Sequence, residues 1–453
     1  MKPNPDRQLL NPLDVALRCI DHAIRGMGFP GFETQMLVAL AERVDVPRLR
    51  NALTRFGRRH PVVTARLVED EGRHPSFWQF RPGAIPQLPE IELSSAEPSA
   101  VLAAAANLLS TPQDPAAADP LRFHLLHRPG GGDVLVIQYN HTLIDNSATA
   151  LIVREIDGLS QTGGTAEQDQ PHFEPRFLIG NYLRHVPHAD RRAAAQAAIE
   201  LQAHIIRSRG ALLGRGEKNV TRPTRLKVAA RVAEPELTRA IRGRAAELCG
   251  LPSLSMAMLG SAFRGIRALG SPEHNTGRHY NAGIGLDLDL REESGALLQN
   301  LLSLVAIYAR GDELADRDGL VRSLSLQMRD RLVRRLDLGI VRLVHVFHRR
   351  PRYVSWVMGH LLRWSCSVWY AYFGALDSVG PRFCGVPVER VQYIGPTWSP
   401  KGIALLVDQF AGRLYLQLTF DPELVAEPLA NTYLDWLMGD LEEFAAASPP
   451  RSL

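Results

Sequence analysis

The chain has 453 residues, more than a typical single hydrophobic core holds, so its length predicts two domains or lobes. Hydrophobic residues make up 45% and charged residues 22% of it, which is the composition of a globular protein and not of a disordered or fibrous one. The formal net charge of +4 is small for this length. It argues against a dedicated nucleic-acid-binding protein, but it would not repel an anionic cofactor or carrier protein.

The four cysteines, Cys19, Cys249, Cys366 and Cys384, are scattered without a C-x-x-C spacing. They predict neither a disulfide framework nor a zinc site, and they suit a reducing compartment. The N-terminal sequence lacks the apolar core of a signal peptide. We therefore expect a cytoplasmic protein.

Apolar periodicity predicts alternating helices and strands in the first third of the chain. A strand at 120–126 and a near-continuous apolar strand at 134–139 are joined by a glycine-rich turn, so they are expected to form a hairpin. His124 and His127 are expected on faces of this sheet and not as metal ligands. Before the hairpin we expect helices at 13–22 and 46–59 and strands at 33–41 and 63–68.

The strand at 134–139 runs directly into Asn140 and His141, and four residues later the chain reaches Asp145. A helical pattern then begins, with Asn146 or Ser147 as its expected N-cap. A neutral imidazole can take a proton from a nucleophile and return it to a leaving group, so His141 is a candidate general base. Asp145 could orient the ring or pair with a distant arginine, and the spacing does not choose between these roles.

The segment 140–146, NHTLIDN, resembles the HHxxxDG motif of the condensation-domain and chloramphenicol-acetyltransferase-like superfamily. That superfamily includes peptide-synthetase condensation domains, polyketide-associated acyltransferases and wax-ester-synthase-like enzymes. The resemblance implies that His141 is the catalytic base and that Asp145 is structural and paired with an arginine. Asn140 stands where the motif has its first histidine, and Asn146 stands where it has glycine.

Residues 161–176 have the composition of a linker, which predicts an N-terminal lobe at 1–160 and a C-terminal lobe at 177–453. The second part should contain a hairpin near 403–420 and a final helix near 428–444. The other elements expected there are helices at 190–213, 235–248 and 253–269 and strands at 224–232 and 281–291.

The strand at 281–291 ends in Asp289, Leu290 and Arg291, and Gln299 and Asn300 follow. This order resembles the D-L-R and G-N segments of the superfamily. The resemblance implies that Arg291 pairs with Asp145 and that Asn300 and Asn146 lie near the substrate. Trp398 and Ser399 lie in a rigid loop that the resemblance places near the substrate. Only their position in the chain supports this expectation.

The stretch 331–376 begins with many basic residues and continues with an aromatic and apolar run that charged and polar residues interrupt. A transmembrane helix is not expected. Three interpretations remain: helices buried against the second lobe, an interfacial helix pair that makes a peripheral membrane contact, or a lining for a long acyl chain.

Taken together, the resemblance implies an α/β protein of two chloramphenicol-acetyltransferase-like lobes, each a mixed sheet flanked by helices, with a central cleft or tunnel. The implied activity is transfer of an acyl group from a coenzyme A or carrier-protein phosphopantetheine thioester to an alcohol or amine, which would be a small-molecule or lipid acceptor. Backbone N–H groups just after His141 are expected to stabilise the oxyanion, and no metal or permanently bound cofactor is expected. The alternative is a non-catalytic scaffold that binds a carrier protein or a partner enzyme.

Overall fold

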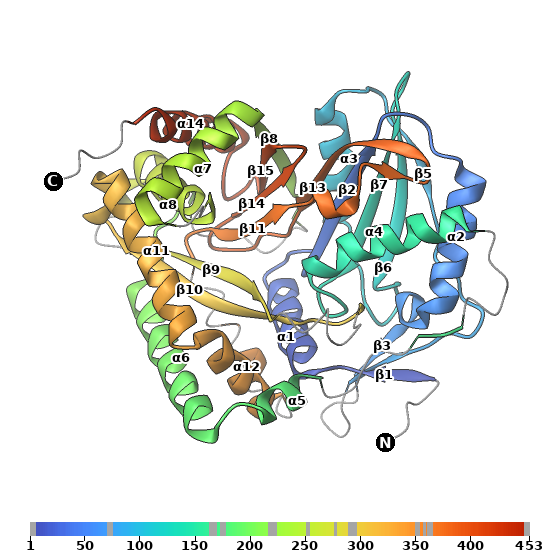
Figure 1. The fold of residues 1–453 in the computed structure, drawn as a ribbon, viewed down its shortest axis with the longest axis horizontal. Coiled ribbons are helices and arrows are strands. Elements are labelled where there is room, and N and C mark those ends of the chain that lie inside the picture. The colour runs from blue at the N-terminus through green and yellow to red at the C-terminus, as the bar shows by residue number, and fades with distance from the viewer. Residues whose placement is uncertain are drawn as a thin grey trace.

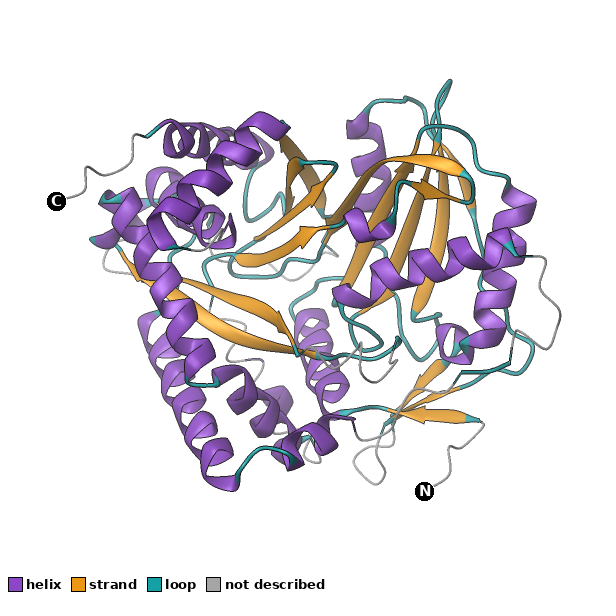
Figure 2. Cartoon of the chain, viewed as in Figure 1, coloured by secondary structure: helices purple, strands orange, loops and turns teal. Residues whose placement is uncertain are grey.

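The computed structural model describes residues 6–69, 76–162, 170–172, 178–215, 224–250, 254–275, 279–288, 297–348, 354–356, 359 and 366–447. They form two lobes side by side, each built around a mixed β-sheet with helices against it (Figure 1). Figure 2 shows how helices surround the strands of both lobes.

The strands are β1 (Arg7–Leu9), β2 (Glu33–Leu40), β3 (Arg66–Val68), β4 (Phe77–Gln79), β5 (Glu90–Glu92), β6 (Leu121–His127), β7 (Asp133–Asn140), β8 (Lys227–Ala233), β9 (His279–Asp287), β10 (Leu302–Arg310), β11 (Trp369–Ala375), β12 (Arg382–Phe383), β13 (Val386–Ile394), β14 (Ile403–Phe410) and β15 (Arg413–Phe420). The helices are α1 (Pro12–Gly26), α2 (Val46–Arg59), α3 (Pro98–Ser110), α4 (Asn146–Gln161), α5 (Leu178–Arg184), α6 (His188–Ser208), α7 (Pro235–Cys249), α8 (Leu254–Leu269), α9 (Pro272–Asn275), α11 (Arg317–Val333), α12 (Leu336–Phe347) and α14 (Glu427–Ala446). Short 3₁₀ helices cover Pro61–Thr64, Glu313–Ala315 and Asp377–Val379.

The sheet of the first lobe has the strand order β12-β13-β2-β7-β6-β5. Strands β2 and β7 are buried along their whole length, which explains why β7 is a continuous apolar run. Apolar residues of α2 and α4 pack with one face of the sheet, and residues of α3 pack with the other. The predicted hairpin is confirmed, because β6 and β7 pair antiparallel from Leu121–Tyr139 to His127–Asp133.

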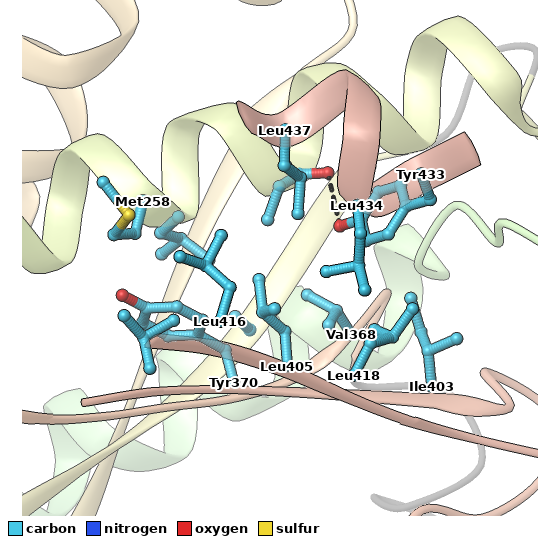
Figure 3. Close-up of a cluster of buried hydrophobic side chains, with 14 of the residues drawn as sticks. Met258, Val368, Tyr370, Ile403, Leu405, Leu416, Leu418, Tyr433, Leu434 and Leu437 are labelled. Carbon is cyan, nitrogen blue, oxygen red and sulfur yellow. Dashed lines mark hydrogen bonds between the residues drawn. The ribbon is translucent and has the colours of Figure 1, made fainter. Parts of the chain in front are cut away.

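The sheet of the second lobe has the order β11-β14-β15-β8, with β11 parallel to β14 and the other pairs antiparallel. Its core lies between this sheet and the helices α8 and α14. Figure 3 shows part of this core, where Leu405, Leu416 and Leu418 of the sheet face Leu434 and Leu437 of α14. The predicted hairpin and final helix are therefore β14–β15 and α14.

A late segment of the chain completes the sheet of the first lobe. Strand β13 pairs antiparallel with β2, from Val388–Leu40 to Ile394–Gln35. The chain then crosses directly into β14 of the other sheet, and β13 and β14 contact each other. The loop 395–402, well beyond the expected linker, thus connects the sheets of the two lobes, while the boundaries at 160 and 177 stay a prediction.

Several elements differ from the sequence-based expectations. The strand expected at 63–68 is a 3₁₀ turn followed by the short strand β3. The apolar run before residue 376 ends in β11, an edge strand, so the expectation of a helix is wrong for that part. Aromatic residues, in which β11 is rich, favour strands. The expected D-L-R segment at 289–291 lies outside the described residues. Within the described residues, no helix is long and apolar enough to cross a membrane.

Candidate active site

The candidate base His141 occupies the turn that follows β7, and its backbone is fixed from two sides. Its N–H donates to the carbonyl of Phe32 at 3.0 Å, just before β2. The side chain of Asn140 accepts a hydrogen bond from the N–H of Thr142 at 2.8 Å, and its carbonyl accepts from the N–H of Leu143 at 2.9 Å. Asn140 therefore shapes the turn that presents the imidazole.

The two N–H groups just after His141 are consequently already occupied. They were expected to stabilise an oxyanion, but both donate to Asn140 within the turn. This part of the prediction is wrong, because a tight turn satisfies its own buried N–H groups.

The His141 ring is enclosed by aromatic residues and a hydroxyl. It stacks on Phe32 with ring centroids 4.5 Å apart and meets the edge of Tyr139 at 5.5 Å. Its Nε2 is 2.9 Å from Oγ1 of Thr34 in β2. Burial lowers the pKa of His141 to about 4, with the backbone of Ile144 acting in the opposite direction. The ring is therefore neutral at pH 7, which is the state that a general base needs.

Asp145 connects the turn to the second half of the chain. One carboxylate oxygen accepts a hydrogen bond from the N–H of Leu301 at 2.7 Å. The other accepts from the N–H of Ala148 at 3.3 Å, so Asp145 is the N-cap of α4. The cap was expected at Asn146 or Ser147, one or two residues later. The expected partner Arg291 lies outside the described residues, so that pairing stays a prediction.

Asn300 joins the candidate base to the N-terminal helix. Its side-chain nitrogen donates to the carbonyl of His141 at 2.8 Å and to Oδ1 of Asp14 in α1, also at 2.8 Å. Burial raises the pKa of Asp14 to about 8, although N–H donors from Asn300 and Asn11 act to lower it. Asn300 thus lies beside His141 and its described contacts are with protein groups, so its predicted contact with substrate stays a prediction.

Asn146 extends the hydrogen-bonded network along the first turn of α4. Its side-chain oxygen accepts from the hydroxyl of Tyr139, and its carbonyl accepts from the hydroxyl of Tyr393 in β13 at 2.9 Å. Tyr139 also contacts the His141 ring. Asn146 therefore supports the wall around the candidate base.

Trp398 belongs to the same aromatic cluster. Its ring is 6.0 Å from that of Phe32 and 4.9 Å from that of Trp369 in β11. Ser399, the next residue, is half-buried, and the described hydrogen bonds do not connect it to the other predicted site residues. The structure thus brings Trp398 close to the site but gives Ser399 no described contact with it.

Four residues at or near the site were not expected from the sequence: Asp14, Phe32, Thr34 and Lys401. Lys401 is 1% exposed, and its Nζ lies 3.3 Å from the ring centroid of Trp398. Burial lowers the pKa of this ammonium group to about 7. The other three come from α1 and from the start of β2, more than a hundred residues before His141. No local motif marks them, so only strand register could have suggested Thr34, which lies opposite Tyr139.

Access to the imidazole is limited, since only 6% of the surface of His141 is exposed. A cavity of about 340 Å³ lies along α1 and does not include His141 among its lining residues, which are Leu10, Val15, Arg18, Cys19, His22, Glu69, Ser76 and Ser355. Arg18 at this cavity pairs with Asp21, which accepts the N–H of Phe32 at 2.7 Å. Within the described ranges, no group of three or more His, Cys, Asp or Glu could hold a metal ion.

No protein-family model matches the chain. Among curated proteins, nonribosomal peptide synthetase 8 of Aspergillus fumigatus is 26% identical over 155 residues, which are 34% of this chain and 2% of that protein. The chain therefore matches a small part of a much longer relative.

Three solved structures share the fold over nearly the whole chain. The TRI3 trichothecene 15-O-acetyltransferase of Fusarium sporotrichioides superposes with a TM-score of 0.71 at 11% identity, covering 97% of this chain and 95% of that one. The first condensation domain of the calcium-dependent antibiotic synthetase, bound to a substrate analogue, gives 0.70 at 15% identity, covering 99% and 98%. The epimerization domain of the third module of tyrocidine synthetase B gives 0.62 at 12% identity, covering 98% of both chains. The predicted fold is confirmed: two lobes of the condensation-domain, chloramphenicol-acetyltransferase-like type.

Proposed function

We propose that this chain, which has the fold of condensation domains, is an acyltransferase. It would move an acyl group from a thioester to an alcohol or an amine, with His141 as general base. The observation that carries the proposal is the neutral imidazole, whose Nε2 is 2.9 Å from a hydroxyl, that of Thr34. An acceptor hydroxyl or amine would take the place of this hydroxyl and donate its proton to Nε2. The similarity to the trichothecene 15-O-acetyltransferase supports acyl transfer as the reaction class.

In the proposed step, the acceptor loses its proton to His141 while its oxygen or nitrogen bonds to the thioester carbonyl carbon. The carbon–sulfur bond then breaks, and the imidazolium returns the proton to the departing sulfur. The products are an ester or amide and a free thiol, on coenzyme A or on a carrier-protein phosphopantetheine arm. No covalent acyl-enzyme is required, because the base activates the acceptor directly.

Substrate must also be able to reach the His141 ring, and the residues around the ring suggest a route. Trp369, which packs against Phe32 and Trp398, is partly exposed, unlike those two residues. It comes from edge strand β11 of the second lobe, whereas Phe32 and His141 come from the first. We infer that substrate approaches between the lobes past Trp369.

The test is thiol release from acetyl-, octanoyl- and palmitoyl-coenzyme A and from an acyl carrier protein loaded with the same groups, with a panel of alcohols and amines. His141→Ala should lower the rate by about 10²–10⁴-fold, the usual contribution of a general base. His124→Ala is a matched control, because burial also lowers the pKa of His124 to about 4, yet this ring lies on β6.

Equal rates for the wild type and His141→Ala would refute His141 as the base. The scaffold alternative is favoured by Asn140 in place of the motif's histidine and by the small exposure of the ring. A wild-type protein that releases no thiol from any donor, but binds the carrier protein, would establish that alternative.

A further inference from the structure

The segment around α12 exposes an unusual amount of apolar surface. Five of the eight large apolar side chains that are exposed in the described part of the chain lie between residues 326 and 356. Single exposed apolar residues are normal on protein surfaces, but a concentration in one segment indicates an interaction site. The five are Leu326 (64% exposed), Leu332 (46%), Val333 (74%), Val346 (51%) and Trp356 (62%).

Two of these residues lie at a projecting corner. Helix α11 ends at Val333 and α12 begins at Leu336, so Leu332, Val333, Arg334 and Arg335 are four consecutive exposed residues. Arg335 has a φ of 55°, which lets the chain turn sharply between the helices. Figure 1 shows α11 running into α12 along the flank of the molecule, with α6 beside them.

The exposed residues continue along both helices from this corner. Leu326 and Val333 are seven residues apart and therefore lie on one face of α11, while Leu320 and Leu324 face the core. On α12, Arg342 and Val346 are one turn apart and share a face. Exposed apolar and basic side chains thus lie next to one another at the corner that the two helices make.

The charge of this segment differs from that of the rest of the chain. Residues 326–346 contain five arginines, of which Arg331 is buried, and two aspartates, whereas the formal net charge of all 453 residues is +4. Exposed Arg334 lies 3.6 Å from Asp330 and Arg335 lies 3.8 Å from Asp337. The Arg334–Asp330 pair is exposed on both sides, and such pairs are weak in water, so Arg334 remains able to bind an anionic surface.

We propose that the corner from Leu326 to Val346, with Leu332 and Val333 at its tip, is a docking surface for a membrane that contains anionic lipid. The arginines would meet lipid headgroups while Leu332 and Val333 enter the boundary with the acyl chains. Nucleic acid would use the same positive charge but would leave Leu332 and Val333 without a role. The proposal does not depend on acyl transfer.

Flotation of the full chain with vesicles tests the proposal. We expect the protein to bind vesicles of phosphatidylcholine with phosphatidylserine at least tenfold more strongly than vesicles of phosphatidylcholine alone, and to bind less at high salt. The double variant Leu332→Asp/Val333→Asp should lower binding tenfold or more, and Arg329→Gln/Arg334→Gln should remove most of the preference for anionic lipid.

The matched control is Ile85→Asp, since Ile85 is 41% exposed on the other lobe. It should bind vesicles as the wild type does, and circular dichroism should show that every variant is folded. Absence of vesicle binding by the wild type would overturn the proposal. A dimer in light scattering that Leu332→Asp/Val333→Asp dissociates, without vesicle binding by the wild type, would also overturn it. RNA binding that Arg329→Gln/Arg334→Gln abolishes, without any lipid binding, would overturn it as well.

Discussion

The carboxylate of Asp145 accepts the backbone N–H of Leu301 at 2.7 Å, which links two segments 156 residues apart in the sequence. Asp145 also caps α4, the helix that begins directly after the turn of the candidate base. One side chain therefore determines both where that helix starts and how the second half of the chain lies against it.

Replacing Asp145 by alanine should remove both hydrogen bonds. Loss of a helix cap costs about 0.5–2 kcal/mol, and a buried N–H without an acceptor costs about 1–3 kcal/mol. Urea denaturation should therefore show a loss of about 2–4 kcal/mol in the free energy of unfolding. Asp45→Ala is the control, because Asp45 caps α2 on the surface and its loss should cost the cap alone. An Asp145→Ala protein no less stable than this control would contradict the role of Leu301.

Asn140→Ala should loosen the turn that carries His141, because the N–H of Thr142 loses its acceptor. We expect a loss of about 1–3 kcal/mol in stability and a lower kcat. Asn140→His should restore much of both, since a neutral imidazole also has a nitrogen that can accept this N–H. Steady-state kinetics and thermal unfolding of the two variants check this. A histidine variant as poor as the alanine variant would show that the turn requires the amide itself.

Thr34→Val keeps the shape of the side chain but removes the hydroxyl that is 2.9 Å from Nε2 of His141. In the proposed reaction the acceptor takes the place of this hydroxyl, so Thr34 can hold the ring only until the acceptor binds. We therefore expect kcat/KM to fall in Thr34→Val, while Thr34→Ser keeps most of the activity. Nitrogen NMR of the imidazole in both variants reports the tautomer directly. If Thr34→Val changes neither the tautomer nor kcat/KM, the hydroxyl does not position the base.

Asn300→Ala removes the amide that joins the His141 carbonyl to Asp14. Both acceptors are buried, so we expect a loss of stability of about 1–3 kcal/mol and a fall in kcat larger than the change in KM. Asn431→Ala provides the comparison, since the half-buried side chain of Asn431 donates to the carbonyl of Glu427 in its own helix and accepts only a long hydrogen bond from Arg231. Comparable effects of the two substitutions would refute the positioning role of Asn300.

The pH profile of kcat/KM should reflect the buried imidazole. Because burial lowers the pKa of His141 to about 4, the ring stays neutral and active well below pH 6.5 and is protonated near pH 4. The acid limb should therefore lie near pH 4. Between pH 4 and 6.5 the unfolded chain binds this proton while the folded chain does not, so this group makes stability rise with pH across that range. An acid limb near pH 6.5 would instead show that the imidazole has the pKa of a solvent-exposed histidine.

The sequence predicted those elements whose pattern is local. The apolar run of β7, the glycine turn before it and the periodicity of α4 were sufficient to place His141 at a strand end before a helix. The strand expected at 33–41 is β2, within one residue of its observed end. The resemblance of 140–146 to a known motif then supplied the fold class, which the solved structures confirm.

Reasoning from the sequence failed where the hydrogen-bond partner of a group depends on how the chain folds. It assigned the cap of α4 to Asn146 or Ser147, and the turn N–H groups to an oxyanion, because it could not weigh the contacts of Asp145 and Asn140. It also missed Thr34 and Lys401, which no local motif marks.

The local pattern alone was enough to place a histidine directly after a buried strand and a carboxylate four residues later. The partners of these groups could be read only from the folded chain: Thr34 Oγ1 lies beside Nε2 of His141, Asn300 donates to the His141 carbonyl, and the N–H of Leu301 donates to Asp145. This difference arises because the local conformation of a residue depends mainly on its near neighbours in the sequence. Burial, pKa and hydrogen-bond partners depend on which distant segments fold against it.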